Sequence, residues 1–389
     1  MKTVLFFYRG QISPERGGIA KITHTLAKTF TENGYRVFFM GITKDLDKPN
    51  LDNQYYIPSS DFSRSLNFMV DFCKRNKIDF IINQAAMNPE VVSFLYEVKK
   101  LAKDMTIISC VHNCTITPIK NYAYQKEYGL RKRYQPWLFY MLKNTLVNNL
   151  MQYIYIVKYR KQYLELIDKS DIVTVLCDGL KDELLKMVGL HDCNKLLVIP
   201  NCMPPMSKYS YLEKKNQILW VAEMSISTKR PDILLNAWEM ILKDFPTWEV
   251  HMLGDGADLL EMKDLVKCKK IKRVYFEGRV KTDEFYKESK IVCITSTHES
   301  FSLTTLEGLY YGCVPIVINS FPAAKMLIQR GKNGILVDDF KAKSLAKALS
   351  SLISDDTNLK SMALKSIESS ERFSPDRIFN NYWLPLLSV

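Results

Sequence analysis

Long apolar stretches are missing from this sequence of 389 residues. No uninterrupted apolar run reaches the roughly 18 residues that a helix needs to span a bilayer. The apolar start, residues 4–8, ends at Arg9-Gly10 and lacks a small-residue cleavage site, so it predicts a first β-strand and not a signal peptide. We therefore expect a cytoplasmic protein, and any contact with the cell membrane is expected to be peripheral, on its inner face.

Paired cysteines and nucleotide-binding glycine repeats are missing as well. The nine cysteines form no CxxC pair, which argues for buried thiols in a reducing compartment. Only five histidines occur, and none lies beside a cysteine pair, so neither a metal site nor a bound cofactor is expected. The one DxD motif, Asp45–Asp47, lies in a polar loop and predicts a surface position. The absence of G-x-G-x-x-G argues against a nicotinamide enzyme.

The composition indicates a folded chain with more than one core. Hydrophobic residues make up 47% and charged residues 25%, which excludes a disordered chain, and the length favours two or three domains. Short apolar runs alternate with helical patterns such as Gly18–Asn33, as in parallel sheets covered by helices. The predicted strands are Thr3–Tyr8, Arg36–Gly41, Phe80–Gln84, Met105–Val111, Ile172–Leu176, Leu196–Ile199, Ile218–Ala222, Trp248–Leu253, Arg273–Glu277, Ile291–Thr295, Val314–Ile318 and Gly334–Val337.

A polar segment rich in proline interrupts this alternation at residues 200–216. The pattern then restarts, and two consecutive α/β halves of similar length predict two Rossmann-like domains, 1–202 and 203–370. The end of the chain, Pro375–Leu387, predicts a helix with an apolar face. Residues 371–389 are therefore assigned to a separate C-terminal helix.

The formal net charge of +12 is concentrated in residues 120–163. This stretch carries nine Lys or Arg against one acid, Glu127, interleaved with eleven aromatic residues. Cations and amphipathic rings suit an anionic membrane surface. Nucleic acid and an ordinary solvated helical face are the alternatives. Contact with the cytoplasmic membrane surface is favoured, and nucleic acid ranks last because no RNA-binding signature accompanies the charge.

Two carboxylates with seven residues between them follow the predicted strand Ile291–Thr295. Glu299 lies in the loop, and Glu307 lies within the second turn of a helix that is predicted to begin near Ser302. The helix start offers unpaired backbone N–H groups and a positive dipole end, which suit a diphosphate. Carboxylates accept strong hydrogen bonds from sugar and ribose hydroxyls. These groups suit a nucleotide sugar, but two glutamates at this spacing are weak evidence by themselves, and a helix with two ordinary acidic residues is the alternative.

Further motifs surround this element in a fixed order. Gly312–Pro315 leads from a helix end into a buried strand, Lys332–Asp338 follows, and Leu253–Gly256 and Phe276–Gly278 lie upstream. In this combination, over nearly all of residues 218–389, the sequence resembles the family 4 retaining glycosyltransferases.

The resemblance implies an α/β fold of the GT-B type, in which two Rossmann-like domains with parallel sheets face each other across a cleft. It assigns residues 1–202 to the acceptor side and residues 203–370 to the nucleotide-sugar donor. Residues 371–389 would form a helix that crosses back to the N-terminal domain.

The resemblance also implies roles for the residues of the Glu299 element. Glu299 would contact the transferred sugar as a catalytic residue, and Glu307 would bind the ribose. The remaining donor contacts of this element are expected from Phe301, Ser302, Leu303 and Thr304. No enzymic nucleophile and no metal are implied.

In the same family a basic pair binds the donor diphosphate. Lys229 matches the lysine of the pair as a catalytic residue, but Glu223 stands where the arginine is expected. A carboxylate beside a diphosphate would repel it. Either Arg230 substitutes as a donor ligand, or the loop reshapes the contact, or the donor binds more weakly.

Four further positions match donor or sugar contacts of the family. Gly17 and Gly18 resemble its Gly-Gly loop, which faces the donor phosphates, and adjacent glycines let backbone approach a ligand closely. His112 follows a predicted strand and matches a histidine that contacts the transferred sugar. Gly254 belongs to the strand-end Leu253–Gly256 motif and is also expected at the donor.

These features predict a retaining glycosyltransferase. The donor would be a nucleotide sugar, with UDP-sugars favoured, and the acceptor a saccharide or a lipid-linked saccharide of bacterial polysaccharide or lipopolysaccharide assembly. Two alternatives remain, a GT-B sugar-nucleotide epimerase or hydrolase and a non-catalytic partner that binds sugar nucleotides.

Overall fold

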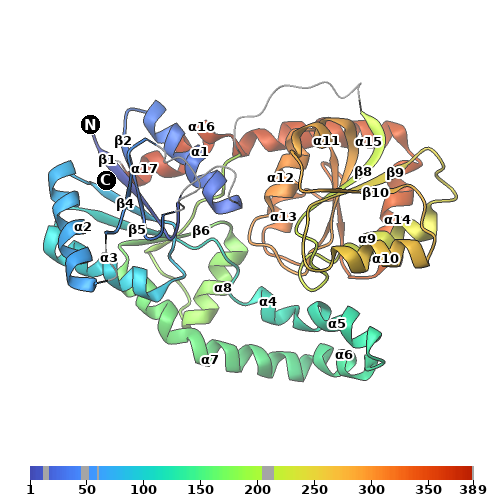
Figure 1. Ribbon diagram of the computed structural model, residues 1–389, viewed down its shortest axis with the longest axis horizontal. Helices are drawn as coiled ribbons and strands as arrows, with labels where there is room; N and C mark the ends of the chain where they lie inside the picture. The colour runs from blue at the N-terminus through green and yellow to red at the C-terminus, as the bar shows by residue number, and fades with distance from the viewer. Residues whose placement is uncertain (12–16, 45–51, 59–60, 204–213, 388–389) are drawn as a thin grey trace. The chain divides into compact units, whose positions relative to one another are not determined.

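A computed structural model describes residues 1–11, 17–44, 52–58, 61–203 and 214–387. The Asp45–Asp47 motif and most of the proline-rich segment lie outside the described residues. The chain divides into two compact units, each with one sheet (Figure 1). The first unit comprises Met1–Thr115, Ile156–Pro205 and Phe373–Val389, and the second comprises Ile116–Tyr155 and Met206–Arg372.

The first unit contains a seven-stranded parallel sheet in the order β3-β2-β1-β4-β5-β6-β7. Its central strands consist mostly of apolar residues because helices cover both faces of a parallel sheet. Phe6 on β1 and Ile82 on β4 are fully buried partners in register. The strands are β1 (Thr3–Tyr8), β2 (Arg36–Gly41), β3 (Gln54–Tyr56), β4 (Phe80–Asn83), β5 (Thr106–Cys110), β6 (Ile172–Val175) and β7 (Leu196–Val198).

Helices of the first unit cover both faces of this sheet (Figure 1). The C-terminal segment lies against α1, and the rings of Phe379 and Trp383 pack edge-on against Phe30 at centroid distances of 5.1 and 5.6 Å. The end of the chain is therefore part of the first unit's core. The elements are α1 (Gly18–Glu32), α2 (Phe62–Asn76), α3 (Pro89–Ala102), α8 (Asp178–Val188), α16 (Pro375–Ile378), the π-helical turn η3 (Phe379–Trp383) and α17 (Leu384–Leu387).

The second unit contains a six-stranded parallel sheet in the order β10-β9-β8-β11-β12-β13. The strands are β8 (Lys215–Val221), β9 (Glu249–Leu253), β10 (Val274–Gly278), β11 (Ser289–Ile294), β12 (Val314–Ile318) and β13 (Ile335–Val337). The helices and short turns around them are α9 (Pro231–Ile241), α10 (Leu259–Cys268), α11 (Asp283–Glu288), α12 (Leu303–Tyr310), α13 (Ala324–Leu327), α14 (Ala342–Ile353), α15 (Asp356–Ser370) and the 3₁₀ turn η2 (Glu371–Phe373).

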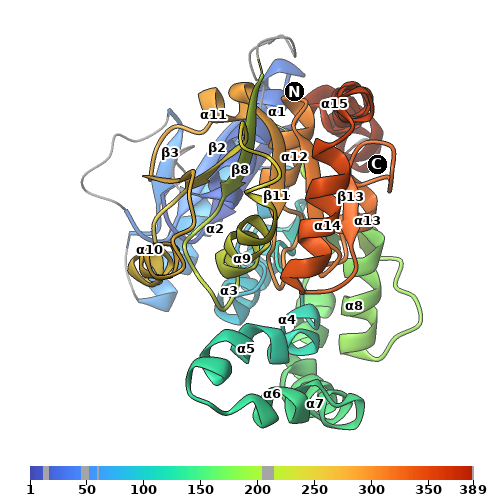
Figure 2. The same ribbon diagram turned by 90° about the vertical axis from the view of Figure 1, so that its right-hand side faces the viewer.

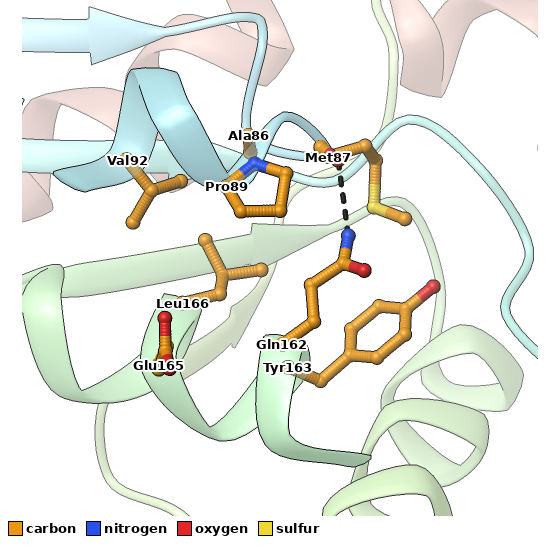
Figure 3. A pocket seen from close by; sticks show the side chains of 8 residues that line it. All are labelled: Ala86, Met87, Pro89, Val92, Gln162, Tyr163, Glu165 and Leu166. Atoms are coloured by element: carbon orange, nitrogen blue, oxygen red, sulfur yellow. Dashed lines mark hydrogen bonds between the residues drawn. The ribbon is translucent and has the colours of Figure 1, made fainter. Parts of the chain in front are cut away.

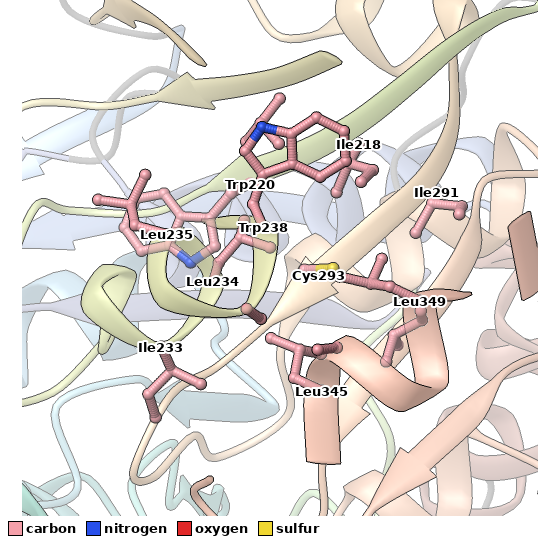
Figure 4. Close-up of a cluster of buried hydrophobic side chains, with 14 of the residues drawn as sticks. Ile218, Trp220, Ile233, Leu234, Leu235, Trp238, Ile291, Cys293, Leu345 and Leu349 are labelled. Carbon is pink, nitrogen blue, oxygen red and sulfur yellow. The ribbon is translucent and has the colours of Figure 1, made fainter. Parts of the chain in front are cut away.

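One face of the second sheet packs against α9 and α14 around two buried tryptophans (Figure 4). Trp220 and Trp238 are at most 1% exposed. Their indole N–H groups donate to Thr295 Oγ1 and Lys272 O, each at 3.0 Å, so neither ring buries an unpaired polar atom. This core holds the strand ends of the second sheet in place.

The helices between β5 and β6 are shared between the units. They are α4 (Thr117–Lys120), α5 (Tyr122–Lys132), α6 (Pro136–Lys143) and α7 (Thr145–Lys169). Residues 116–155 belong to the second unit, and the rest of α7 belongs to the first. The basic aromatic stretch, expected within the N-terminal domain, therefore belongs for the most part (residues 120–155) to the second unit. A ring contact between Tyr124 and Phe340, with centroids 4.1 Å apart, contributes to this packing.

The fold prediction of two Rossmann-like parallel-sheet domains is confirmed. Three predicted strands, Thr3–Tyr8, Arg36–Gly41 and Val314–Ile318, have the observed bounds, and the others differ at one or both ends by one to three residues. The short edge strand β3 (Gln54–Tyr56) was missed because it offers only three residues and is half exposed. The predicted helix Gly18–Asn33 is α1, and Pro375–Leu387 is helical but contains the π-turn η3.

Candidate functional site

A pocket of about 600 Å³ lies in the second unit at the carboxyl ends of β8, β9 and β10. This volume is in the range of small-molecule sites, and the carboxyl edge of a parallel sheet is where α/β folds bind ligands. Its lining consists of Val221, Ala222, Glu223, Leu253, Gly254, Asp255, Gly256, Gly278, Arg279, Val280 and Thr282.

Gly254 lets two strand-end loops meet in this pocket. Its φ of +125° is unfavourable for residues with a side chain, and a Cβ there would lie 1.9 Å from the carbonyl oxygen of Ala222. The Met224 N–H donates to Asp255 O at 3.0 Å and the Gly254 N–H to Gly278 O at 2.7 Å. The glycine is therefore required by the backbone geometry of the pocket wall.

Helix α12 begins beside the same pocket. Ser302 is its N-cap, in a left-handed conformation with φ of +63°, and its side chain accepts from the Thr305 N–H. Thr304 Oγ1 donates to Val221 O at 3.2 Å, which attaches the helix start to the pocket lining. The amides of Leu303 and Thr304 precede the first intrahelical hydrogen bond, so they can bind an anion. The side chain of Phe301 is 2% exposed and supports the turn from the core.

Lys229 and Glu299 meet in the second unit. The ammonium of Lys229 lies 2.5 Å from Glu299 Oε1, and both side chains are about one-fifth exposed. Ser296 Oγ donates to the same carboxylate oxygen at 2.7 Å. The Lys229 carbonyl accepts from Thr295 Oγ1 at 2.7 Å, which fixes the Lys229 loop to the end of β11. Tertiary structure thus joins two predicted catalytic residues that are 70 positions apart in the sequence.

Glu307 faces a buried tyrosine from the second turn of α12. Burial raises the pKa of Tyr286 well above its usual value, and the negative charge of Glu307 raises it further. The Tyr286 hydroxyl therefore stays protonated beside the carboxylate. Tyr286 also stacks on Tyr311 with ring centroids 5.8 Å apart. Glu307 therefore lies close to a buried aromatic pair.

Arg230 differs from its predicted donor-binding role. Its guanidinium is 4% exposed and forms two parallel 2.9 Å hydrogen bonds with Asp232. It also donates to Glu127 Oε2 at 3.2 Å and to Tyr124 O at 2.9 Å. The side chain is therefore engaged in a buried network that attaches α5 to the start of α9.

His112, Gly17 and Gly18 belong to the first unit. His112 follows β5, and its Nε2–H donates to Gln84 Oε1. Burial lowers the pKa of His112 to about 4, so the imidazole is neutral near pH 7 and can hydrogen-bond a hydroxyl without carrying charge. Gly17 is the N-cap of α1 with φ of +92°, and Gly18 is the first residue of that helix.

The first unit contains two other hollows, which differ from the second-unit pocket in volume or in polarity. The first, between α3 and α7, has a volume of about 10 Å³, and Gln162 Nε2 donates to Met87 O at its edge (Figure 3). It can hold at most one water molecule. The second has about 570 Å³ and lies near the ends of β1 and β2, where Phe7, Phe62 and Phe94 make it apolar.

Two residues of the second-unit site were missed in the sequence analysis. Arg279 lines the pocket next to Gly278 and supplies a cation on the wall that contains Glu223. Tyr286, on α11, lies close to Glu307. The sequence indicates Arg279 only through its position, because it follows the predicted strand Arg273–Glu277 after a single glycine. No signal indicated Tyr286, because its neighbour is 21 residues away.

The described part of the chain contains neither a membrane-spanning helix nor a cluster of metal-ligating side chains. None of its helices is long and apolar enough to cross a membrane. No three His, Cys, Asp or Glu side chains in the same residues converge as metal ligands would.

Comparisons with known proteins concern this second unit above all. Residues 206–369 match the family model described as Glycosyl transferases group 1. An uncharacterized glycosyltransferase of Haemophilus influenzae is 30% identical over 185 residues, which cover 47% of this chain and 52% of the relative. The chain thus spans about half the length of that relative.

Solved structures are similar over the whole chain. The crystal structure of Anabaena HepE in complex with UDP has a TM-score of 0.73 at 15% identity, with 100% of both chains covered. The lipopolysaccharide outer core galactosyltransferase WaaB, in its apo form, has a TM-score of 0.69 at 16% identity, with 99% of both chains covered. At these identities the similarity establishes the two-domain fold.

Proposed function

We propose that this chain, whose residues 206–369 match the glycosyl transferases group 1 family model, transfers a sugar from a nucleotide-diphosphate sugar to a hydroxyl group, with retention at the anomeric carbon. A UDP-sugar is the favoured donor, because HepE, which is similar over its full length, is described in complex with UDP. The nucleotide occupies the second-unit pocket.

The observation that carries the proposal is the joining of Lys229 and Glu299 beside the start of α12. A cation for the diphosphate is paired with a carboxylate for sugar hydroxyls, and this carboxylate lies three residues before the N-cap of α12, whose first amides can bind an anion. The ion pair keeps both groups in position before the donor binds. When the diphosphate binds, it competes for the Lys229 ammonium and leaves the Glu299 carboxylate to accept from the sugar.

The proposed reaction develops negative charge on the departing diphosphate. Lys229 and the amides of Leu303 and Thr304 stabilise that charge as the bond to the sugar breaks. Glu307, close to Tyr286, holds the ribose. No enzymic nucleophile is assigned, and the acceptor proton passes to the leaving phosphate. His112, as a neutral imidazole, is proposed to contact the sugar, and the Gly17–Gly18 turn is proposed to contact the phosphates.

The proposed acceptor is a saccharide or a lipid-linked saccharide at the cytoplasmic face of the cell membrane. WaaB is described as a lipopolysaccharide outer core galactosyltransferase, which supports a role in lipopolysaccharide or surface polysaccharide assembly. The basic aromatic helices support a membrane-borne acceptor, since their composition suits an anionic lipid surface.

Replacing Glu307 tests the ribose assignment. In Glu307→Ala the nucleoside loses a charged hydrogen-bond acceptor, which is worth about 1.5–3 kcal/mol, so the UDP dissociation constant should rise roughly tenfold or more. Isothermal titration calorimetry measures it. Glu239→Ala, on α9 outside the pocket, is the control and should bind UDP as the unchanged chain does. Equal affinity in Glu307→Ala and the control would remove Glu307 from the site.

One observation favours a second candidate, a non-catalytic partner that binds sugar nucleotides. Glu223 lines the pocket at the position where the family has an arginine, although Arg279 in the same lining offers a replacement cation. Incubation with UDP-sugars and a lipid-linked oligosaccharide fraction separates the candidates. Transfer with retained anomeric configuration supports the enzyme, tight binding without product supports the partner, and free sugar or epimer without acceptor supports a hydrolase or epimerase.

A further inference from the structure

The helical arm, which we define as residues 116–155, exposes a large apolar surface. In α6, Trp137, Tyr140 and Met141 are 44–62% exposed and follow i, i+3, i+4 spacing. Phe139 of the same helix points inward and is 4% exposed. Because Phe139 is buried while these three side chains are exposed, the exposed side chains form one face of α6.

The first half of α7 continues this face. Leu146, Leu150, Tyr153 and Ile154 follow i, i+4, i+7, i+8 spacing and are 57–80% exposed. Side chains at these spacings lie on one side of a helix. Together with Tyr134, which is 91% exposed, they form the arm face. Large apolar side chains that are exposed together on two consecutive helices mark an interaction surface.

The exposed charged side chains of the arm are all positive. All six of its Lys and Arg side chains are exposed, whereas its one acid, Glu127, is 14% exposed and paired with Arg131 and Arg230. Among the described residues no ion pair involves Lys120, Lys126, Arg133 or Lys143. An apolar face bordered by unpaired cations and interfacial Trp and Tyr is complementary to an anionic lipid surface.

The base of the arm is fixed to the donor-binding unit. Asn121 Nδ2 donates to Thr297 O at 2.6 Å and to Ser320 O at 2.8 Å, and Lys132 pairs with Glu261 at 2.7 Å. Arg230, which follows Lys229 directly, bonds the α5 carbonyl of Tyr124 at 2.9 Å. The arm is therefore attached firmly to the unit that contains the Lys229–Glu299 pair.

We propose that the arm face is a docking surface for an anionic lipid bilayer and that it attaches the donor-binding unit to the membrane. The inference rests on the proposed function only for the choice of a membrane-borne acceptor. A nucleic acid would leave the exposed aliphatic side chains of α7 unpaired. A second copy of this chain would bring two sets of cations together, which is unfavourable at low salt.

Vesicle co-sedimentation of the full chain tests the proposal. We expect binding to vesicles of phosphatidylglycerol and phosphatidylcholine at low salt, with weaker binding as salt rises and little binding to pure phosphatidylcholine. The double variant Leu146→Ser/Leu150→Ser should lower the partition coefficient at least tenfold, because two aliphatic side chains no longer enter the bilayer. Leu260→Ser/Leu364→Ser, at exposed positions of α10 and α15, should bind as the unchanged chain does.

Two double variants, each of which reverses two positive charges, test the electrostatic contribution to vesicle binding. Lys126→Glu/Arg133→Glu on the arm should abolish the salt-dependent binding, whereas Lys343→Glu/Lys347→Glu on α14 should leave most of it. No binding at low salt, or equal loss in both members of a pair, would overturn the proposal. So would a dimer in sedimentation velocity that the Leu146→Ser/Leu150→Ser variant dissociates. UDP affinity of the same preparations is measured without vesicles, so failure of the donor site and failure of the arm are distinguished.

Discussion

At the residue scale, neighbouring cations of the second unit have different surroundings. Lys229 pairs with one carboxylate and remains about one-quarter exposed, whereas Arg230 is buried among three acceptors. Exposure leaves Lys229 able to exchange Glu299 for a diphosphate. Burial gives Arg230 a structural role, because a ligand would have to replace its bidentate bond to Asp232.

Variants of this pair should separate stability from donor binding. Arg230→Met leaves Asp232 and Glu127 without their partner, so the free energy of unfolding should fall by about 3–5 kcal/mol, with UDP affinity of the folded protein little changed. Lys229→Met should weaken UDP binding roughly tenfold or more with little loss of stability, since its partner is partly solvated. Urea denaturation and calorimetry measure the two effects. A large loss of UDP affinity in folded Arg230→Met would restore Arg230 as a donor ligand.

The depressed pKa of His112 predicts a pH dependence in the first unit. The folded pKa of about 4 lies below the ordinary 6.5, so between these values the unfolded chain binds more protons and stability rises with pH. The contribution is complete above pH 6.5 and declines as pH falls towards 4. We expect His112 to account for about 1–2 kcal/mol of the stability lost between pH 7.5 and pH 5.

Denaturation of His112→Asn at both pH values measures this contribution, which should be absent from the variant. The imidazole resonance in the unchanged protein should titrate with a midpoint near pH 4. A midpoint near 6.5 would contradict the burial argument.

At the element scale, the second-unit pocket depends on two strand-end loops whose backbones touch directly, with no side chain between them. The strand-end segments after β8 and β9 approach so closely at Gly254 that a methyl group cannot fit. The same requirement for close contact places the α12 start against Val221. The pocket wall is therefore determined by backbone packing before any side chain contacts a ligand.

Gly254→Ala should disturb this wall. Positive φ and the clash with the Ala222 carbonyl should cost roughly 1–3 kcal/mol and weaken UDP binding through the displaced loop. Gly129→Ala, in α5 with nothing near the added methyl, is the control and should be neutral or slightly stabilising. Thermal unfolding with and without UDP measures both. Unchanged melting and UDP affinity in Gly254→Ala would show that the loops can separate.

At the scale of the whole molecule, the two units have their own sheets and cores. The C-terminal residues return to the first unit, where Trp383 is 2% exposed against Phe30. Multidomain chains often unfold in more than one step. A change in this aromatic cluster should therefore act on one unit alone.

Trp383→Ala should destabilise the first unit by about 3–5 kcal/mol because it leaves a cavity in the core. Calorimetry should show one transition moving to lower temperature, while the transition that UDP stabilises stays in place. Trp383→Phe retains a ring and removes a buried N–H that has no hydrogen-bond partner among the described residues, so it should cost much less. Equal shifts of both transitions would show that the units unfold together.

The sequence by itself determined the fold class, the series of parallel strands and the Glu299–Glu307 element. These features depend on local periodicity and on spacing along one strand-loop-helix segment, both of which are readable from neighbouring residues. Only the tertiary structure decided that Lys229 pairs with Glu299, that Arg230 is buried against Glu127, and that residues 116–155 belong with the donor-binding unit. These are contacts between segments about 70 to more than 100 residues apart, and they depend on how the helices pack onto the sheet, which no local pattern encodes.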